Sequence, residues 1–308
     1  MLAGQMQTTP LRVIDILNYA AAAHGAREIV SRLVEEPLWR YDYAALGRRA
    51  ERCARVLGRL GVRPGDRVAT LCWNTHRHLE LFYAAPGIGA VLHTVNPRFF
   101  DDQILYTLEH AESRILFFDP NFLPLVERLA PKLRHIRVFV MTSDAARTLP
   151  GAVGAISYEA LLAEETGDFD WPVFDENAGA ILCYTSGTTG EPKGALYSHR
   201  AIVLHAMAVG LPGAFALDAF DVVMPCASMF HATAWGLPYA APLNGAKLVL
   251  PCDKMDGASI QELIAGEGVT FTGGVPTIWT MYLDHLERTG EKPGALERVI
   301  IGGSAVPR

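Results

Sequence analysis

Between residues 185 and 194 the sequence TSGTTGEPKG groups hydroxyl, glycine and lysine residues in a way suited to binding phosphate. Glycines allow positive φ angles and a close approach of the backbone, so that successive amides can converge on a phosphate oxygen. Hydroxyls add hydrogen-bond donors without bulk, Pro192 limits how far the loop can collapse, and Lys193 supplies a positive charge. The glycines are Gly187, Gly190 and Gly194, and the hydroxyl residues are Thr185, Ser186, Thr188 and Thr189. These residues predict a loop that grips a polyphosphate.

The spacing differs from that of the common P-loop, which requires G-x-x-x-x-G-K-[ST]. Counted from Gly187, the sixth position is Pro192 rather than glycine, and Lys193 is followed by Gly194. A surface loop without function is the ordinary interpretation of an arbitrary cluster of glycine, serine and threonine. Here the order T-S-G-T-T-G-x-P-K-G is specific over ten positions, which favours a phosphate site of another kind.

The apolar run AILCY directly before this loop is expected to be a strand, and loops at the carboxyl ends of such strands are where α/β proteins bind ligands. Short, continuously apolar runs alternate with helical periodicity along the chain, as in parallel sheets covered on both faces. Strands are expected at 66–73, 90–98, 113–120, 136–143, 178–186, 221–227, 246–251, 269–274 and 297–303. Helices are expected at 41–61, 75–90, 101–112, 124–133, 199–210, 258–268 and 275–288.

This alternation predicts the α/β class, with packed layers of mainly parallel sheet and helices. Residues 144–177 are acidic, show no clear period and are expected to connect a first α/β region, 1–143, with a second, 178–308, that carries the phosphate loop. The chain stops just after a strand and at the start of a turn, so we expect a fragment whose fold is incomplete at its carboxyl end.

Composition excludes several classes of function. The 308 residues carry a net charge of -6 without a run of lysine and arginine, which argues against nucleic-acid binding. No apolar stretch approaches the roughly 20 residues that span a bilayer, and the first residues do not read as a secretion signal. The five cysteines form no C-x-x-C pair and are expected to be reduced and buried in a cytoplasmic protein; they are Cys53, Cys72, Cys183, Cys226 and Cys252.

The segment 185–194 resembles the phosphate-loop signature of the AMP-forming acyl-CoA synthetases, within the adenylate-forming superfamily. Other segments resemble the same family, in its order and over essentially the whole chain: 73–98, SMFHATAWG at 228–236, GGVPT at 273–277 and GGSAVP at 302–307. The resemblance implies the large N-terminal domain of such an enzyme. It also implies activation of a carboxylate by MgATP to an acyl-adenylate, followed by transfer of the acyl group to coenzyme A.

The resemblance also implies roles for individual residues. Thr185 would reach Mg²⁺, and Ser186, Gly187, Thr188, Thr189, Gly190 and Lys193 would wrap the β- and γ-phosphates of ATP. His231 would lie beside the carboxylate and the adenylate, and Trp235 would gate the passage between the acyl tunnel and the nucleotide. Gly303 and Ser304 would border the adenine. Without the resemblance, a lone histidine such as His231 is more often a core residue, and Trp235 is equally well a packing residue.

Several alternatives remain open. A medium- to long-chain fatty acid is the expected substrate, but a short sulfur-containing acid such as methylthiopropionate is an alternative, because a few side chains of 277–281 set the depth of the pocket. An amino-acid adenylation domain is less favoured, because SMFHATAW offers a histidine and a tryptophan where such domains carry an aspartate. A truncated module that binds nucleotide without chemistry is a further alternative.

The family's later motifs do not occur within these 308 residues. Those motifs carry an aromatic residue over the adenine, a glutamate for the magnesium, an aspartate for the ribose and a catalytic lysine. We therefore expect these residues alone to lack full turnover. Members of this branch often pair through their N-terminal regions, which makes a homodimer the expected assembly.

Overall fold

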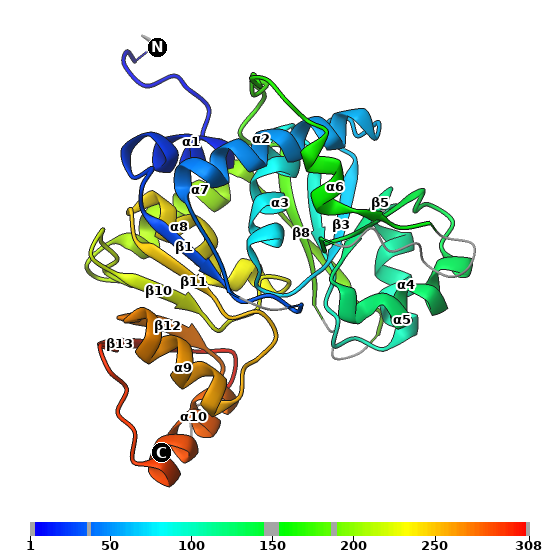
Figure 1. Cartoon of the computed structure of the whole chain (residues 1–308). Coiled ribbons are helices and arrows are strands. Elements are labelled where there is room, and N and C mark those ends of the chain that lie inside the picture. Colours follow the sequence, from blue (N-terminus) through cyan, green and yellow to red (C-terminus); the bar gives the residue numbers. More distant parts are fainter. Residues whose placement is uncertain (1–3, 36–37, 145–153, 186–189, 306–308) are drawn as a thin grey trace.

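The computed structural model describes residues 4–35, 38–144, 154–185 and 190–305, and Figure 1 shows two sheets with helices between them and on their outer sides. Within these ranges one sheet has six strands. Their order across the sheet is β13 (Arg298–Ile301), β12 (Phe271–Gly274), β10 (Val222–Pro225), β11 (Lys247–Leu250), β1 (Glu28–Ser31) and β2 (Trp39–Asp42). Neighbouring strands are parallel except for the edge strand β2, which is antiparallel to β1.

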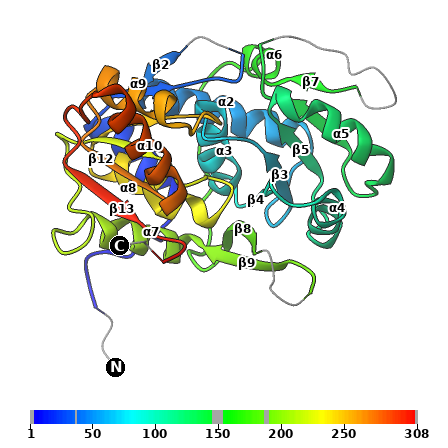
Figure 2. The ribbon, with the colours of Figure 1, turned by 90° about the horizontal axis from the view of Figure 1, so that it is seen from below.

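The other sheet has seven strands in the described residues. Their order is β7 (Ile156–Ser157), β6 (Val138–Met141), β5 (Ile115–Phe118), β3 (Arg67–Leu71), β4 (Val91–Thr94), β8 (Gly179–Thr185) and β9 (Lys193–Ser198). All its neighbours are parallel except β8 and β9, which form an antiparallel hairpin. Figure 2 shows this hairpin at one end of the sheet, beside β4 and far from β7.

Helices form a central layer between the sheets and an outer layer on each. One apolar cluster joins both sheets to the central helices, and two further clusters lie under the outer helices. The central helices are α1 (Val13–Ala23), α2 (Tyr43–Arg59), α3 (His76–Gly87), α7 (His199–Gly210) and α8 (Leu237–Leu243). The outer helices are α4 (Asp101–His110) and α5 (Leu123–Leu129) on the seven-stranded sheet, and α9 (Gly257–Glu267) and α10 (Pro276–Thr289) on the other. In the part of the chain described, none of these helices has the length and apolarity needed to cross a membrane.

The helix α2 illustrates how the sequence determines these elements. Leu46, Ala50, Cys53 and Leu57 recur at helical spacing, and all four side chains are fully buried in the central layer. Asp42 caps the helix, because its Oδ1 accepts a hydrogen bond of 2.7 Å from the backbone N–H of Ala45. The α/β class and the mainly parallel sheets, predicted from the same kind of pattern, are confirmed.

Each sheet combines strands from both halves of the chain. β1 and β2 belong to the six-stranded sheet, whose other strands lie after residue 221, whereas β8 and β9 complete the sheet of the first half. The stretch 144–177, expected to be an irregular connector, also contains β7 and the short helix α6 (Tyr158–Ala163). Whether 1–143 and 178–308 behave as separate regions stays a prediction.

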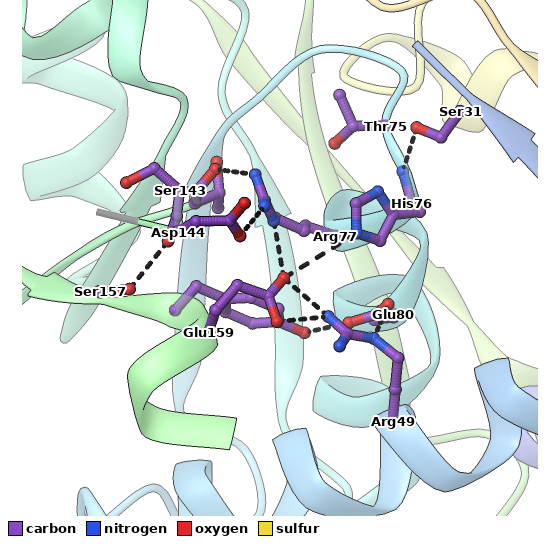
Figure 3. Close-up of polar contacts among 12 residues, drawn as sticks. Ser31, Arg49, Thr75, His76, Arg77, Glu80, Ser143, Asp144, Ser157 and Glu159 are labelled. Carbon is purple, nitrogen blue, oxygen red and sulfur yellow. Dashed lines mark hydrogen bonds and ion pairs between the residues drawn. The ribbon is translucent and has the colours of Figure 1, made fainter. Parts of the chain in front are cut away.

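A buried network of charged side chains holds α3 in place (Figure 3). Arg77 is 1% exposed, and its Nε donates to Glu159 over 2.8 Å. Arg49 donates to the same carboxylate over 2.8 Å and to fully buried Glu80 over 2.7 Å. Burial opposes the charge of Glu159, but His76, whose Nε2 lies 3.9 Å from this carboxylate, and the hydrogen bonds from Arg49 and Arg77 outweigh it and lower its pKa. The network thereby joins α2, α3 and α6 at the start of α3.

Candidate functional site

The predicted phosphate loop connects the two strands of the β8–β9 hairpin. Thr185 ends β8 and Lys193 begins β9, and the two are paired in the antiparallel register. The Thr185 hydroxyl donates to the Lys193 carbonyl over 3.5 Å, and both residues are exposed. Four of the predicted loop residues, Ser186, Gly187, Thr188 and Thr189, lie outside the described residues, whereas Gly190 is described and exposed.

The strand β9 was not predicted, because its residues read as the end of a loop that leads into a helix at residue 199. Gly194 lies opposite Tyr184 in this pairing, where little space is left for a side chain. A Cβ at position 194 would lie 3.0 Å from Leu182 and 3.3 Å from the Tyr184 ring. The Tyr184 hydroxyl is bonded to His110 Nδ1 over 2.7 Å, and burial raises the pKa of this phenol to about 12. The contact with His110 therefore holds Tyr184, the residue before the end of β8, in place.

The second group of predicted residues follows strands of the six-stranded sheet. His231 lies in the segment after β10 and is exposed, so it is not a core histidine. Trp235 is half-buried in the short 3-10 segment η3 (Ala232–Gly236). The four residues Ala232, Thr233, Ala234 and Trp235 all have positive φ angles, between 45° and 55°. Such left-handed backbone is unfavourable for residues other than glycine, so this segment is held in place by its neighbours.

The Trp235 ring lies against the backbone of β12 and of the residue that follows β13. A Cβ at Gly273 in β12 would be 3.3 Å from the ring, and a Cβ at Gly302 after β13 would be 3.4 Å from it. Gly303, with a φ of 86°, and exposed Ser304 continue directly from Gly302. The structure thus brings Trp235 together with the segment predicted to border the adenine. The glycines at 273 and 302 leave the space that the ring occupies.

A buried contact joins the two groups of residues. Cys183 lies two residues before Thr185, and burial raises the pKa of its thiol, whereas the Thr94 hydroxyl and the backbone of Thr233 and Ala232 act in the opposite direction. The Thr94 hydroxyl lies 3.1 Å from the Cys183 sulfur and donates to the carbonyl of Phe230 over 3.1 Å. Two strand residues advance about 7 Å, so the phosphate-loop strand ends close to the segment that carries His231.

The loops of both sheets meet at the carboxyl ends of their parallel strands, where ligands of α/β proteins bind. Thr185 and Lys193 come from one sheet, and His231, Trp235, Gly303 and Ser304 come from the other. The roles of these residues stay predictions. A cavity of about 660 Å³ lies elsewhere, between N-terminal residues such as Leu11 and the side of α7, and includes none of the predicted residues.

The side chains that hold the His231 segment were not predicted from the sequence. Thr94 is one of them, and buried Asn74 is another, with hydrogen bonds to Pro225, Ala227 and Met229. Arg98 lies in a turn after β4, where its backbone N–H donates to Asn96 Oδ1 over 2.9 Å. Its guanidinium also lies 5.9 Å from the centre of the Phe230 ring. The one feature of the sequence that could have indicated Asn74 is its position, as a polar residue directly after the expected strand 66–73.

Comparisons with known proteins show what this chain is similar to. The model of the family described as AMP-binding enzyme matches residues 17–308. The 3-methylmercaptopropionyl-CoA ligase of Ruegeria lacuscaerulensis is 45% identical over 310 residues, which cover 99% of this chain and 57% of that protein. The long-chain-fatty-acid–CoA ligase of Thermus thermophilus is 49% identical over 303 residues, which cover 98% of this chain and 54% of that protein.

A solved structure supports the fold. The crystal structure of a long-chain-fatty-acid–CoA ligase from Archaeoglobus fulgidus matches with a TM-score of 0.85 at 20% identity, and the match covers 100% of this chain and 61% of that one. The chain spans just over half the length of the two sequence relatives above.

Proposed function

Since this chain belongs to the AMP-binding enzyme family, we propose that the protein containing it is an AMP-forming acyl-CoA ligase. One observation carries the proposal. The Thr94 hydroxyl lies 3.1 Å from the Cys183 sulfur and donates to the Phe230 carbonyl over 3.1 Å, which brings the end of the phosphate-loop strand beside the segment of His231 and Trp235. A nucleotide held by the loop would therefore present its α-phosphate near the segment where an acid would bind.

The reaction has two steps. A carboxylate oxygen attacks the α-phosphorus of ATP and pyrophosphate leaves, which gives an acyl-adenylate. The thiolate of coenzyme A then attacks the acyl carbonyl, and AMP leaves. In the first step two anions approach each other, so catalysis rests on positioning and on neutralising charge.

Each residue has a proposed part in this chemistry. Lys193 and the loop amides bind the β- and γ-phosphates, and His231 lies beside the carboxylate. Trp235 separates the acyl side from the nucleotide side, and Gly303 and Ser304 border the adenine. The exposed hydroxyl of Thr185, a hard oxygen at the base of the loop, suits Mg²⁺. When bound, that ion would neutralise phosphate charge.

The proposed substrate is a medium- to long-chain fatty acid, and a short sulfur-containing acid is the second candidate. The similarity to both kinds of ligase supports each of them. The half-buried Trp235 ring, which lies against Gly273 and Gly302, would distinguish the two kinds of acid. A long acid would require this ring to move, whereas a short acid would not. For the whole protein we also propose a homodimer in the cytoplasm, which light scattering and cell fractionation would test.

Acid-dependent exchange of radiolabelled pyrophosphate into ATP tests the proposal. The complete protein is assayed with straight-chain acids of increasing length and with 3-methylmercaptopropionate, and thioester formation is then followed with coenzyme A. We expect exchange with at least one of these acids, and the preferred acid identifies the substrate class. ATP binding without exchange for any acid would instead support a non-catalytic nucleotide-binding module.

A further inference from the structure

Asn74 joins the two sheets at their carboxyl ends. It lies between β3 and α3, is 1% exposed, and directs its side chain at the segment after β10. Its Nδ2 donates to the carbonyls of Pro225 and Ala227, each over 2.9 Å, and its Oδ1 accepts from the backbone N–H of Met229 over 2.8 Å. Its own carbonyl accepts from the N–H of Cys252, just after β11, over 3.0 Å. Both amide hydrogens and the amide oxygen are therefore used.

The segment held by Asn74 leads directly into strained backbone. Met229 is two residues before His231, and the left-handed residues 232–235 follow at once. Left-handed backbone is unfavourable for each residue other than glycine. Such strain persists only where the surroundings fix the backbone. Asn74 fixes the entry to this segment, and the Thr94 hydroxyl fixes its middle through the Phe230 carbonyl.

The hydrogen bonds of Asn74 and of Thr94 reach the segment after β10 from different parts of the fold. Thr94 and Cys183 belong to strands next to the phosphate loop, whereas Asn74 reaches the segment from the start of α3. The charged network around Arg77 and Glu159 holds this start of α3. Loss of the Asn74 amide would leave the hydrogen bond from Thr94 to the Phe230 carbonyl intact, so the segment after β10 would shift rather than unfold.

We infer that Asn74 is a positioning residue for acid activation, which sets the segment of His231 and Trp235 relative to the nucleotide held at Thr185 and Lys193. The inference rests on the function proposed above. Asn74 has no role in touching either substrate; it acts through the Pro225–Met229 backbone. A displacement of about 1 Å at a reacting group can lower a rate by about 10²-fold, so small shifts of this segment are sufficient.

The test compares Asn74→Asp with Asn244→Asp in the complete protein. Aspartate at position 74 keeps an acceptor for Met229 but places negative charge against two carbonyls. Asn244 is the matched control, because its amide also donates to a backbone carbonyl, that of Ala240, over 2.8 Å, at the end of α8 and away from the site. Asn74→Ser, which is small and uncharged, is the second variant in case the aspartate prevents folding.

We expect both Asn74 variants to lower kcat/KM for the acid in pyrophosphate exchange by about tenfold or more, with KM for ATP within about twofold of the unchanged protein. A smaller amount of folded protein would lower the apparent kcat without changing KM. A rise in KM for the acid therefore shows that the acid site has shifted and not merely that less protein is folded. Asn244→Asp should leave both constants unchanged. The inference is overturned if folded Asn74 variants retain the acid KM and kcat of the unchanged protein; a kcat that falls per mole of folded protein, with or without a rise in KM for the acid, supports it. If the unchanged protein exchanges with no acid, the proposed function fails instead.

Discussion

Thr185 and Lys193 are the last paired residues of the β8–β9 hairpin, and the hydroxyl of the first donates to the carbonyl of the second. This pairing fixes both ends of the predicted phosphate loop on one rigid hairpin. The two side chains are exposed, so they are available to a ligand and contribute little to the core.

Substituting these two residues separates binding of phosphate from folding. We expect Lys193→Ala and Thr185→Val each to lower pyrophosphate exchange by about 10²–10³-fold, because each removes one group that stabilises charge in the transition state. The melting temperature should stay nearly constant, as for other exposed positions. Lys292→Ala, at another exposed lysine, is the matched control and should retain full exchange. Full activity of the Lys193→Ala protein would contradict the proposed role of this loop.

Gly273→Ala probes the contact between Trp235 and β12. The new Cβ would lie 3.3 Å from the Trp235 ring, which has to move by a few tenths of an ångström. We expect a changed preference among acids of different length with little change in KM for ATP. Trp235→Ala should shift the same preference toward longer acids. Gly58→Ala controls for the substitution itself, since nothing lies near a Cβ at that position in α2, and an unaltered acid preference in the Trp235→Ala protein would exclude the gate.

Asp119 makes the stability of the fold depend on pH. Burial raises its pKa from the usual 3.8 to about 7, although the backbone N–H of Trp73 donates to its Oδ2 over 2.7 Å. The folded protein therefore holds this proton more tightly than the unfolded chain. This contribution to stability is present at acid pH and is lost as the pH rises through about 7.

Asp119→Asn should remove that dependence, because an amide stays neutral at every pH. We expect the gain in free energy of unfolding over the unchanged protein to be about 2–4 kcal/mol larger at about pH 8 than at about pH 5. Urea titrations at the two pH values measure this difference. Asp170→Asn, at an exposed aspartate, should show no such change, and equal behaviour of the two variants would argue against the assignment.

The charged network at the start of α3 predicts a large loss of stability. Glu159→Ala would leave Arg77, which is 1% exposed, with one fewer counter-ion. Removing one partner of a buried ion pair costs about 3–5 kcal/mol. Glu164→Ala removes an exposed pair with Arg59 and should cost less than about 1 kcal/mol. Urea midpoints of the two variants compare these costs, and a Glu159→Ala midpoint as high as that of Glu164→Ala would contradict the structural role.

Sequence patterns predicted elements whose signal is local. α2 was found from the period of its apolar residues, and the strand β8 from a continuous apolar run. β1 has only the four residues of Glu28–Ser31 and no pattern of its own, and its pairing with β11 depends on distant residues. β9 was hidden because glycine and serine at its ends resemble a loop.

The candidate site shows the same division. The residues at 185, 193, 231 and 235 were found from a motif that is continuous in sequence. Asn74 could not be assigned a role, because its partner Met229 is 155 residues away. The left-handed backbone of Ala232 and Ala234 was equally hidden, since alanine gives no sign of a positive φ angle.

The place of β1 has a consequence for synthesis on the ribosome. Ile29 pairs with Leu248, so the β1–β2 hairpin emerges long before its parallel neighbour has been translated. Until then the nascent chain exposes an unpaired apolar strand edge, which invites wrong association. Such distant pairing slows folding, so β1 cannot take its place in the six-stranded sheet before β11 has been translated.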